Sequence, residues 1–383
     1  MISTQGREDM AHDSTERLII GIDAGGSKTK ACLALAKPLT IAERSTSDPS
    51  LDWTQSIRVI GTGESGPGNP RSVGFDAVYV NLLDAIAKAF QGAGLEQSKA
   101  QAICVSMAGV GQADQRIPVA QWVEQANLAD RIRVSEDVTP IRWAALWETR
   151  HLNHSSLHQA SSHSGGKRLW NNSVTLISGT GSIVSATKDT PQESTSQAHP
   201  LLEVPLISMR VGGWGYLLGD EGSGFAIGLA ALKEICRAHD AGDEFSPMHL
   251  AVLKELDCQD AIDLIPRIYT QPIPRAKIAS LYQTVVQFAS SDLIAGKLIE
   301  YASLDLAELI VSGASRIGLR SGQFGLAFSG GTLSGKSPLV PTILRHLERM
   351  QMSPLLSHQV SDPVIGAVVM ASVLDEASGT RVE

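Results

Sequence analysis

A glycine turn lies between two apolar segments in LIIGIDAGGSKTKACLAL, residues 18–35. This pattern predicts a tight β-hairpin, because glycine readily supplies the positive φ that a short turn needs. The same form returns in VTLISGTGSIVSAT, residues 174–187. Glycine leaves backbone N–H groups uncovered, and hydroxyl donors stand in the two turns at Ser27, Thr29, Thr180 and Ser182. The pair of turns predicts a duplicated α/β architecture whose hairpins face one another across a cleft and can each hold a phosphate.

The rest of the chain alternates helical and strand patterns. We expect a helix at 78–94, a strand entering a glycine loop at 101–111, a helix at 116–128 and a strand at 131–137. We also expect a helix with Thr139 as its N-cap and Pro140 as its first residue, and helices that begin at Gly224 and at 363. Polar insertions interrupt this order at 45–60, 151–172 and 187–200, and residues 1–16 are predicted to be a disordered tail.

Length and charge limit the class of protein. A chain of 383 residues is long enough for two domains, each with its own core. The net charge of -8, without a lysine or arginine block, argues against nucleic acid and anionic membranes as partners. The N-terminus is too polar for a signal peptide, and no apolar run approaches the length of a bilayer span. We therefore expect a cytoplasmic protein with a small-molecule substrate.

Metal and disulfide signals are weak. The four cysteines stand far apart and show no zinc-ligand spacing, so most are predicted to be buried small residues. Four histidines fall within the second polar insertion, at His151, His154, His158 and His163. They could form a metal cluster, but no cysteine or carboxylate stands near them, which favours a solvated insertion.

A P-loop pattern also occurs. Residues 330–337, GGTLSGKS, match the letters of the phosphate-binding P-loop. However, a P-loop requires a later strand that supplies an aspartate for the metal. The only later apolar run, at 363–374, begins after Asp362 and has the character of a helix. We therefore expect a strand ending in a glycine turn at 325–331, with Lys336 an ordinary surface lysine.

Five motifs together resemble a known family. They are GIDAGGSKT (21–29), AGVGQAD (108–114), ISGTGS (177–182), GGWGYLLGDEGSG (212–224) and SGGTLS (329–334). Their residues and order resemble the sugar-kinase branch of the actin-like ATPase superfamily, in the BadF/BadG-type group, and within it the N-acetylglucosamine kinases most closely. The long fourth motif, rich in uncommon residues, is the most specific.

The resemblance implies an α/β actin-like ATPase fold, with two ribonuclease H-like lobes around a nucleotide cleft that holds MgATP with the sugar above it. The expected lobes are 17–139 and 140–360, with a C-terminal helix at 361–383 that returns to the first lobe. The implied ATP-binding residues are Gly25, Gly26, Ser27, Lys28 and Thr29 in the first turn, Gly179, Thr180, Gly181 and Ser182 in the second, and Gly330, Gly331 and Ser334 beside the adenosine.

Two aspartates are the candidates for chemistry. Asp137 stands between a predicted strand and a helix, and the resemblance matches it to the catalytic base; it could instead cap that helix. Its neighbour Glu136 is a rival, but adjacent strand residues point to opposite faces, so only one of them can face the cleft. The resemblance matches Asp23 to a residue that holds Mg²⁺ through water, although Asp23 could also simply form the turn.

Two glycine-rich segments are the candidate sugar sites. In 212–224 the expected contacts are Gly213, Trp214, Gly215 and Asp220, because Trp214 offers a flat apolar face and Asp220 can accept from hydroxyls. The alternative is a buried tryptophan, with Asp220 and Glu221 favouring a helix N-terminus. The second segment, 66–74, carries Asn69, which the resemblance matches to a sugar ligand but which also suits a plain turn; Gly109 is expected beside it.

The resemblance therefore implies an ATP- and Mg²⁺-dependent kinase that phosphorylates N-acetylglucosamine, most readily at O6. Glucosamine and related amino sugars are alternative substrates. An ATPase that activates a reductase or dehydratase through an iron–sulfur cluster is disfavoured by the scattered cysteines. A sugar sensor without catalysis is disfavoured by the presence of Asp137 and both phosphate turns. A homodimer is expected by analogy.

Overall fold

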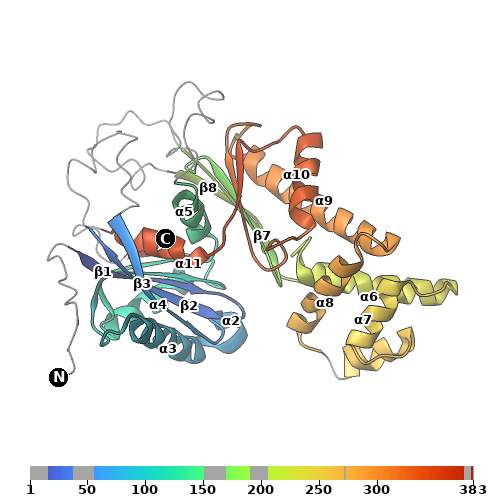
Figure 1. Ribbon diagram of the computed structural model, residues 1–383, viewed down its shortest axis with the longest axis horizontal. Coiled ribbons are helices and arrows are strands. Elements are labelled where there is room, and N and C mark those ends of the chain that lie inside the picture. Colours follow the sequence, from blue (N-terminus) through green and yellow to red (C-terminus); the bar gives the residue numbers. More distant parts are fainter. Residues whose placement is uncertain are drawn as a thin grey trace, which may run out of the picture. The chain divides into compact units, whose positions relative to one another are not determined.

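The computed structural model describes residues 16–37, 56–150, 170–189, 206–270, 273–374 and 381–382 (Figure 1). Contacts divide the chain into two compact units. Unit 1 comprises Met1–Pro140, Gln197–Leu202 and Val364–Glu383, and unit 2 comprises Ile141–Ser196 and Glu203–Pro363. Of the predicted tail, only Glu16 lies among the described residues.

Unit 1 is built on a mixed sheet with the strand order β11-β5-β4-β1-β2-β3. Strands β1, β2 and β3 are antiparallel neighbours, whereas β4 and β5 run parallel to β1. The strands are β1 (Arg17–Ala24), β2 (Thr29–Ala36), β3 (Ile57–Ser65), β4 (Ala100–Met107), β5 (Ala129–Glu136) and β11 (Arg381–Val382). Because β1, β4 and β5 are parallel, their carboxyl ends meet at one edge of the sheet, where α/β proteins bind ligands.

Helices cover both faces of this sheet. On one face lie α3 (Phe75–Ala93) and α4 (Ala113–Gln125), whose Tyr79 and Trp122 rings stack with centroids 4.3 Å apart. On the other lies α11 (Pro363–Ser372), which approaches so closely that a Cβ at Gly21 would stand 2.4 Å from the backbone nitrogen of Val368 (Figure 1). The short helix α2 (Pro70–Val73) precedes α3. Alternate residues of the central strands therefore belong to different cores.

Unit 2 repeats the same sheet plan. Its strand order is β10-β9-β6-β7-β8, with β6, β7 and β8 antiparallel neighbours and with β9 and β10 parallel to β6. The strands are β6 (Ser173–Ser178), β7 (Ser182–Asp189), β8 (Leu206–Gly212), β9 (Gly325–Ser329) and β10 (Leu356–Gln359). The first strand of each unit is central, and both predicted hairpins form. The duplicated architecture predicted from the two glycine turns is confirmed.

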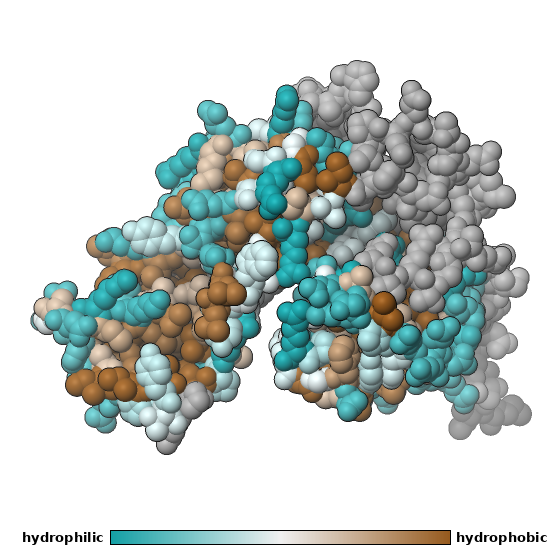
Figure 2. All heavy atoms as spheres, turned by 180° about the vertical axis from the view of Figure 1, so that it is seen from behind, coloured by the Kyte–Doolittle hydropathy of each residue, from teal (hydrophilic) through white to brown (hydrophobic). Residues whose placement is uncertain are grey.

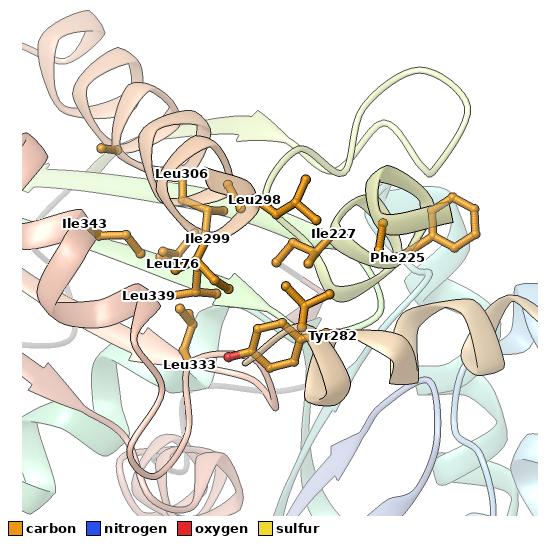
Figure 3. Packing of buried hydrophobic residues seen from close by; sticks show 14 of the residues in the cluster. Leu176, Phe225, Ile227, Tyr282, Leu298, Ile299, Leu306, Leu333, Leu339 and Ile343 are labelled. Carbon is orange, nitrogen blue, oxygen red and sulfur yellow. The ribbon is translucent and has the colours of Figure 1, made fainter. Parts of the chain in front are cut away.

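The described helices of unit 2, with the exception of α5, contribute side chains to one large apolar core. The described helices of unit 2 are α5 (Thr139–Glu148, from Ile141 onward), α6 (Gly224–Ala241), α7 (Pro247–Glu255), η4 (Ala261–Asp263), η5 (Pro266–Thr270), α8 (Arg275–Phe288), α9 (Leu293–Arg316) and α10 (Leu339–Arg349). Figure 3 shows how Leu176 of the sheet, Ile227, Tyr282 and Leu306 of three helices, and Leu333 of a loop point toward one another. This core fixes the loops that follow β6 and β9.

Several predicted boundaries are wrong. The helix expected at 116–128 ends at Gln125, because Asn127 takes a positive φ of 51° before β5 begins. The helix expected to follow a Thr139 cap already includes Thr139. Two supposed insertions reach into strands, since β3 begins at Ile57 and β7 continues to Asp189. The histidine-rich stretch with His151, His154, His158 and His163 lies outside the described residues.

Apolar side chains also reach the surface. On the face in Figure 2, hydrophobic residues gather over the helical part of unit 2. The large exposed apolar side chains of α7, η4, η5 and their flanks are Leu250, Ile262, Ile265 and Tyr269. Much of any folded protein's surface is apolar, so these side chains alone define no site. No helix among the described residues is long and apolar enough to cross a membrane.

Candidate functional site

The first glycine turn joins β1 to β2 at the edge of the unit 1 sheet where the parallel strands β1, β4 and β5 end, which we call the ligand edge. Its backbone closes by a bond from the Gly25 N–H to the Lys28 carbonyl, 2.9 Å, and Gly26, Ser27 and Lys28 are exposed. The Thr29 hydroxyl is different. It is buried and has no hydrogen-bond partner among the described residues, and it lies beside Gly68, where an added Cβ would stand 2.6 Å from it. The donors that this turn offers to a ligand are therefore its exposed backbone and Ser27.

Asp23 belongs to a polar row across the same edge. The strand register places Asp23 beside Ser106 and Ser106 beside Ser135, whose hydroxyls lie 3.0 Å apart. Their neighbours Ile22, Val105 and Val134 face the α3–α4 core, so the row lies on the opposite face of the sheet. Asp137 follows β5 two residues after Ser135.

Glu136 and Asp137 have different surroundings. Glu136 lies on the α4 side, with its carboxylate 3.5 Å from the buried guanidinium of Arg116. Arg116 is also tied to the Val110 carbonyl, at 2.7 Å. This pairing occupies Glu136, so Asp137 is the better candidate for a base. Asp137 stands two residues before the start of α5, and its catalytic role stays a prediction.

Asn69 and Gly109 meet beside the first turn. The Asn69 carboxamide oxygen accepts the Arg71 N–H at 2.9 Å and so caps α2. Gly109, with φ of 82°, is so close that a Cβ there would lie 2.2 Å from that oxygen. Gly68, adjacent to Asn69, donates to the Gly25 carbonyl at 2.8 Å. The structure thus brings the three segments together, while Asn69 also fills the turn-forming role that was its alternative.

The second glycine turn, in unit 2, is held by the long motif at 212–224. Gly179 closes the turn by donating to the Gly181 carbonyl at 2.9 Å, and Thr180 is exposed. The Ser182 hydroxyl donates to the Glu221 carbonyl at 2.6 Å, so it is occupied within the protein. Gly224 donates to the Gly179 carbonyl at 2.8 Å. Thr180 and the exposed backbone are the groups this turn presents outward.

Asp220 lies behind the second turn. The residue is buried and takes a positive φ of 64°, and its carboxylate accepts the Ser182 N–H at 3.3 Å. Its other oxygen lies 2.8 Å from the Arg275 guanidinium at the start of α8. Burial raises the pKa of Asp220, while the Ser182 bond and Arg275 oppose that rise. The cap of α6 is Ser223, so Asp220 is not the helix cap.

Trp214 projects from the loop between β8 and α6. Its side chain is 73% exposed, so the alternative of a buried tryptophan is wrong. Gly213 and Gly215 on either side have φ of 69° and 86°, values that glycine adopts at little cost. An exposed indole remains available for an apolar sugar face.

The third glycine turn follows β9 and adjoins the second. Gly330 has φ of 105°, and a Cβ there would lie 2.1 Å from the Ser178 carbonyl oxygen. Thr332 donates its N–H to that oxygen, and the Leu333 N–H donates to the Gly330 carbonyl. These amides are used within the protein rather than directed at a phosphate, and Lys336 is exposed. Both features disfavour the P-loop interpretation. Gly331 and Ser334 are exposed in this turn.

Tyr282 of α8 is hydrogen-bonded to the third glycine turn. Its hydroxyl donates to the Thr332 carbonyl at 2.7 Å and lies 2.9 Å from the Ser337 hydroxyl. Figure 3 shows the ring among the core residues, with its oxygen toward the segment that carries Leu333. Sequence reasoning missed this residue, because an apolar helix position gives no sign of a bond to a loop fifty residues away.

We expect Tyr282→Phe to lower the free energy of unfolding by about 1 kcal/mol, since the buried Thr332 carbonyl loses one of its two hydroxyl donors and keeps only that of Ser337. Denaturant unfolding monitored by fluorescence measures this change. Exposed Tyr301, 62% accessible, provides the matched control Tyr301→Phe, which should change stability by less than about 0.5 kcal/mol. Equal effects of the two substitutions would contradict the assigned bond.

Metal-binding groups are sparse. No group of three or more His, Cys, Asp or Glu side chains that could hold an ion occurs among the described residues. Cys32 and Cys104 are buried on either side of Gly21 in the sheet of unit 1, whereas Cys236 and Cys258 lie in unit 2. This distribution provides no thiolate set for an iron–sulfur cluster within either unit's described residues.

Comparison with known proteins shows which family the chain is similar to. Residues 20–196, which hold three of the five motifs, match the model of the BadF/BadG/BcrA/BcrD ATPase family, and this match confirms the resemblance to that family. The solved structures described below share the α/β fold of this chain, in which each unit carries a mixed sheet with helices.

Individual relatives are similar over almost the whole chain. An N-acetylmuramic acid/N-acetylglucosamine kinase from Clostridium acetobutylicum is 23% identical over 356 residues, covering 93% of this chain and 98% of the relative. An N-acetyl-D-glucosamine kinase from Dictyostelium discoideum is 25% identical over 367 residues, covering 93% of this chain and 98% of the relative. Two solved structures provisionally named N-acetylglucosamine kinases have TM-scores of 0.59. The one from Chromobacterium violaceum is 22% identical, with 93% and 99% covered, and the one from Porphyromonas gingivalis is 17% identical, with 92% and 97% covered.

Proposed function

We propose that this protein is an ATP-dependent amino-sugar kinase that phosphorylates N-acetylglucosamine at O6. The observation that carries the proposal is the repeated hairpin, which presents an exposed glycine turn at the same place in both sheets. Exposed backbone N–H groups in such turns suit phosphate oxygens. The names of the two curated relatives support an amino sugar as the acceptor.

Each predicted residue then has a task. Asp137 accepts the proton of the attacking sugar hydroxyl, since a carboxylate at the end of a parallel strand can orient that group. The turns at Gly25–Thr29 and Gly179–Ser182 bind phosphate oxygens of ATP, and Gly330, Gly331 and Ser334 contact the adenosine. Trp214, with Gly213, Gly215, Asn69 and Gly109, contacts the sugar. Asp220 was expected to contact the sugar as well, but its two carboxylate oxygens are engaged by Ser182 and Arg275, so we assign it a role through the second turn instead.

The residues present fit a magnesium ion held mainly by the substrate. Mg²⁺ usually keeps several waters and takes one or two carboxylates together with phosphates, so it does not need a cage of protein ligands. Asp23 supplies one carboxylate at the ligand edge, beside the hydroxyl pair of Ser106 and Ser135. When bound, the ion neutralises phosphate charge during transfer. Asp23 would hold it through water.

Other functions remain distinguishable. N-acetylmuramic acid is a second candidate substrate, because the relative from Clostridium acetobutylicum is named for both sugars. An iron–sulfur activator should be coloured and contain iron when purified. A sugar sensor should bind the sugar without releasing ADP. A cytoplasmic location and a homodimer stay predictions from the sequence.

A sugar panel tests the proposal directly. With MgATP and coupled detection of ADP, we expect kcat/KM to be highest for N-acetylglucosamine, compared with glucosamine, N-acetylmannosamine and N-acetylmuramic acid. The 6-deoxy analogue of N-acetylglucosamine is the matched control and should bind without being phosphorylated, since it lacks the acceptor oxygen. Turnover of the 6-deoxy sugar would exclude O6, and no sugar-dependent ADP release across the panel would refute the kinase proposal.

A further inference from the structure

Arg275 occupies an unusual position behind the second glycine turn. It is the first residue of α8, and its guanidinium lies over two aromatic rings, 5.0 Å from the Tyr216 centroid and 5.7 Å from that of Phe225. These two rings pack edge to face at 5.2 Å. The rings hold the guanidinium from one side while Asp220 pairs with it. Nothing in the sequence motifs includes this arginine.

The contact continues from Arg275 to the backbone of the turn. Asp220 uses one carboxylate oxygen for Arg275, at 2.8 Å, and the other for the Ser182 N–H, at 3.3 Å. The fit is close, because a Cβ at Gly181 would stand 2.8 Å from the Asp220 carboxylate. The Asp220 carboxylate therefore packs directly against the backbone of Gly181, and a shift of the carboxylate would shift the turn as well. The Ser182 hydroxyl, bound to the Glu221 carbonyl, fixes the same residue from another direction.

We propose that Arg275 is a positioning residue for ATP binding, which holds the Asp220 carboxylate against the turn Gly179–Ser182 and thereby fixes that turn for phosphate. The inference rests on the proposed function and deepens it. Arg275 itself does not touch the reacting atoms. Its distinctive consequence is a dependence of nucleotide affinity on pH, since the carboxylate works best as an acceptor when it is ionised.

The charges around Asp220 determine the direction of that dependence. Arg275 of α8 favours the ionised carboxylate and neighbouring Glu221 disfavours it, and burial is the largest influence, raising the pKa of Asp220. Glu221 in turn interacts with Asp305 of α9. Removing Arg275 raises the pKa of Asp220 further, so the carboxylate takes up its proton at a higher pH than in the wild type. Nucleotide affinity should then fall earlier as the buffer is made more acidic.

The experiment titrates the full chain with Mg·ADP across a range of pH by calorimetry. For Arg275→Gln we expect binding about tenfold weaker than wild type in acidic buffer, with the two converging in alkaline buffer. Arg275→Lys keeps the charge and should recover most of the lost affinity. The matched control is Lys277→Gln on the same helix, which removes the ion pair with Glu255 at similar exposure and should leave the profile unchanged.

A second variant keeps the test decisive if Arg275→Gln does not fold. Asp220→Asn retains an acceptor oxygen but cannot titrate, so the acidic loss of affinity should disappear. An Asp220→Asn profile like that of wild type would overturn the proposal, as would an equal loss at every pH in Arg275→Gln. Wild-type protein that binds no Mg·ADP would instead refute the proposed function itself. If wild type binds Mg·ADP and the variants show the same pH profile as wild type, the kinase proposal survives and this inference fails.

Discussion

Replacing Asp137 by Asn is expected to lower kcat for N-acetylglucosamine phosphorylation by about two to four orders of magnitude. The amide is nearly the same size as the carboxylate but cannot accept the proton of the attacking hydroxyl. Binding of Mg·ATP should change little, because the two glycine turns that we propose to bind phosphate do not include this residue. Steady-state assays with coupled ADP detection give kcat, and calorimetric titration with a non-hydrolysable ATP analogue gives the affinity.

The neighbouring residue provides the control for this experiment. Glu136 is also a carboxylate at the end of β5, but it pairs with Arg116 on the α4 side of the sheet, 3.5 Å away. We expect Glu136→Gln to reduce stability modestly, by about the contribution of one partly buried ion pair. Turnover should stay within a few-fold of wild type. Near-normal turnover in Asp137→Asn, or an equally large loss in Glu136→Gln, would remove Asp137 as the base.

The hairpins were predictable because their signal is local. An apolar run, a glycine turn and a second apolar run specify strand pairing within fewer than twenty residues, and both hairpins formed as expected. The alternation of the strands also agrees with the position of Glu136 on the α4 side, the side that Val134 faces, whereas the orientation of Asp137 beyond the end of β5 stays a prediction. Local periodicity thus carries information about which side chains share a face.

The supports of the site were not predictable, because they depend on distant contacts. Arg275 reaches Asp220 across 55 residues of sequence, and Tyr282 reaches Thr332 across 50. Both lie on α8, whose sequence predicts only an amphipathic helix. The buried hydroxyl of Thr29 is a similar case, since Gly68 from another loop covers it. Tertiary packing, rather than local propensity, decides such positions.

The second large effect concerns stability. Gly330→Ala should lower the free energy of unfolding by about 3 kcal/mol or more, because two costs combine. A φ of 105° is strained for any residue with a side chain, and the new Cβ would stand 2.1 Å from the Ser178 carbonyl oxygen. That carbonyl also accepts from Thr332, so movement to relieve the clash would break a buried bond at 2.8 Å. Denaturant unfolding of the nucleotide-free protein measures the loss.

The adjacent glycine separates backbone strain from the general effect of adding a methyl group. A Cβ at Gly331 would meet no heavy atom within 4 Å, and its φ is outside the left-handed region. Gly331→Ala should therefore change stability by less than about 0.5 kcal/mol. If the two variants were equally stable, Gly330 could not hold the backbone conformation described for it. The third turn would then follow a different path past Ser178, and the contact described between the second and third glycine turns would be wrong.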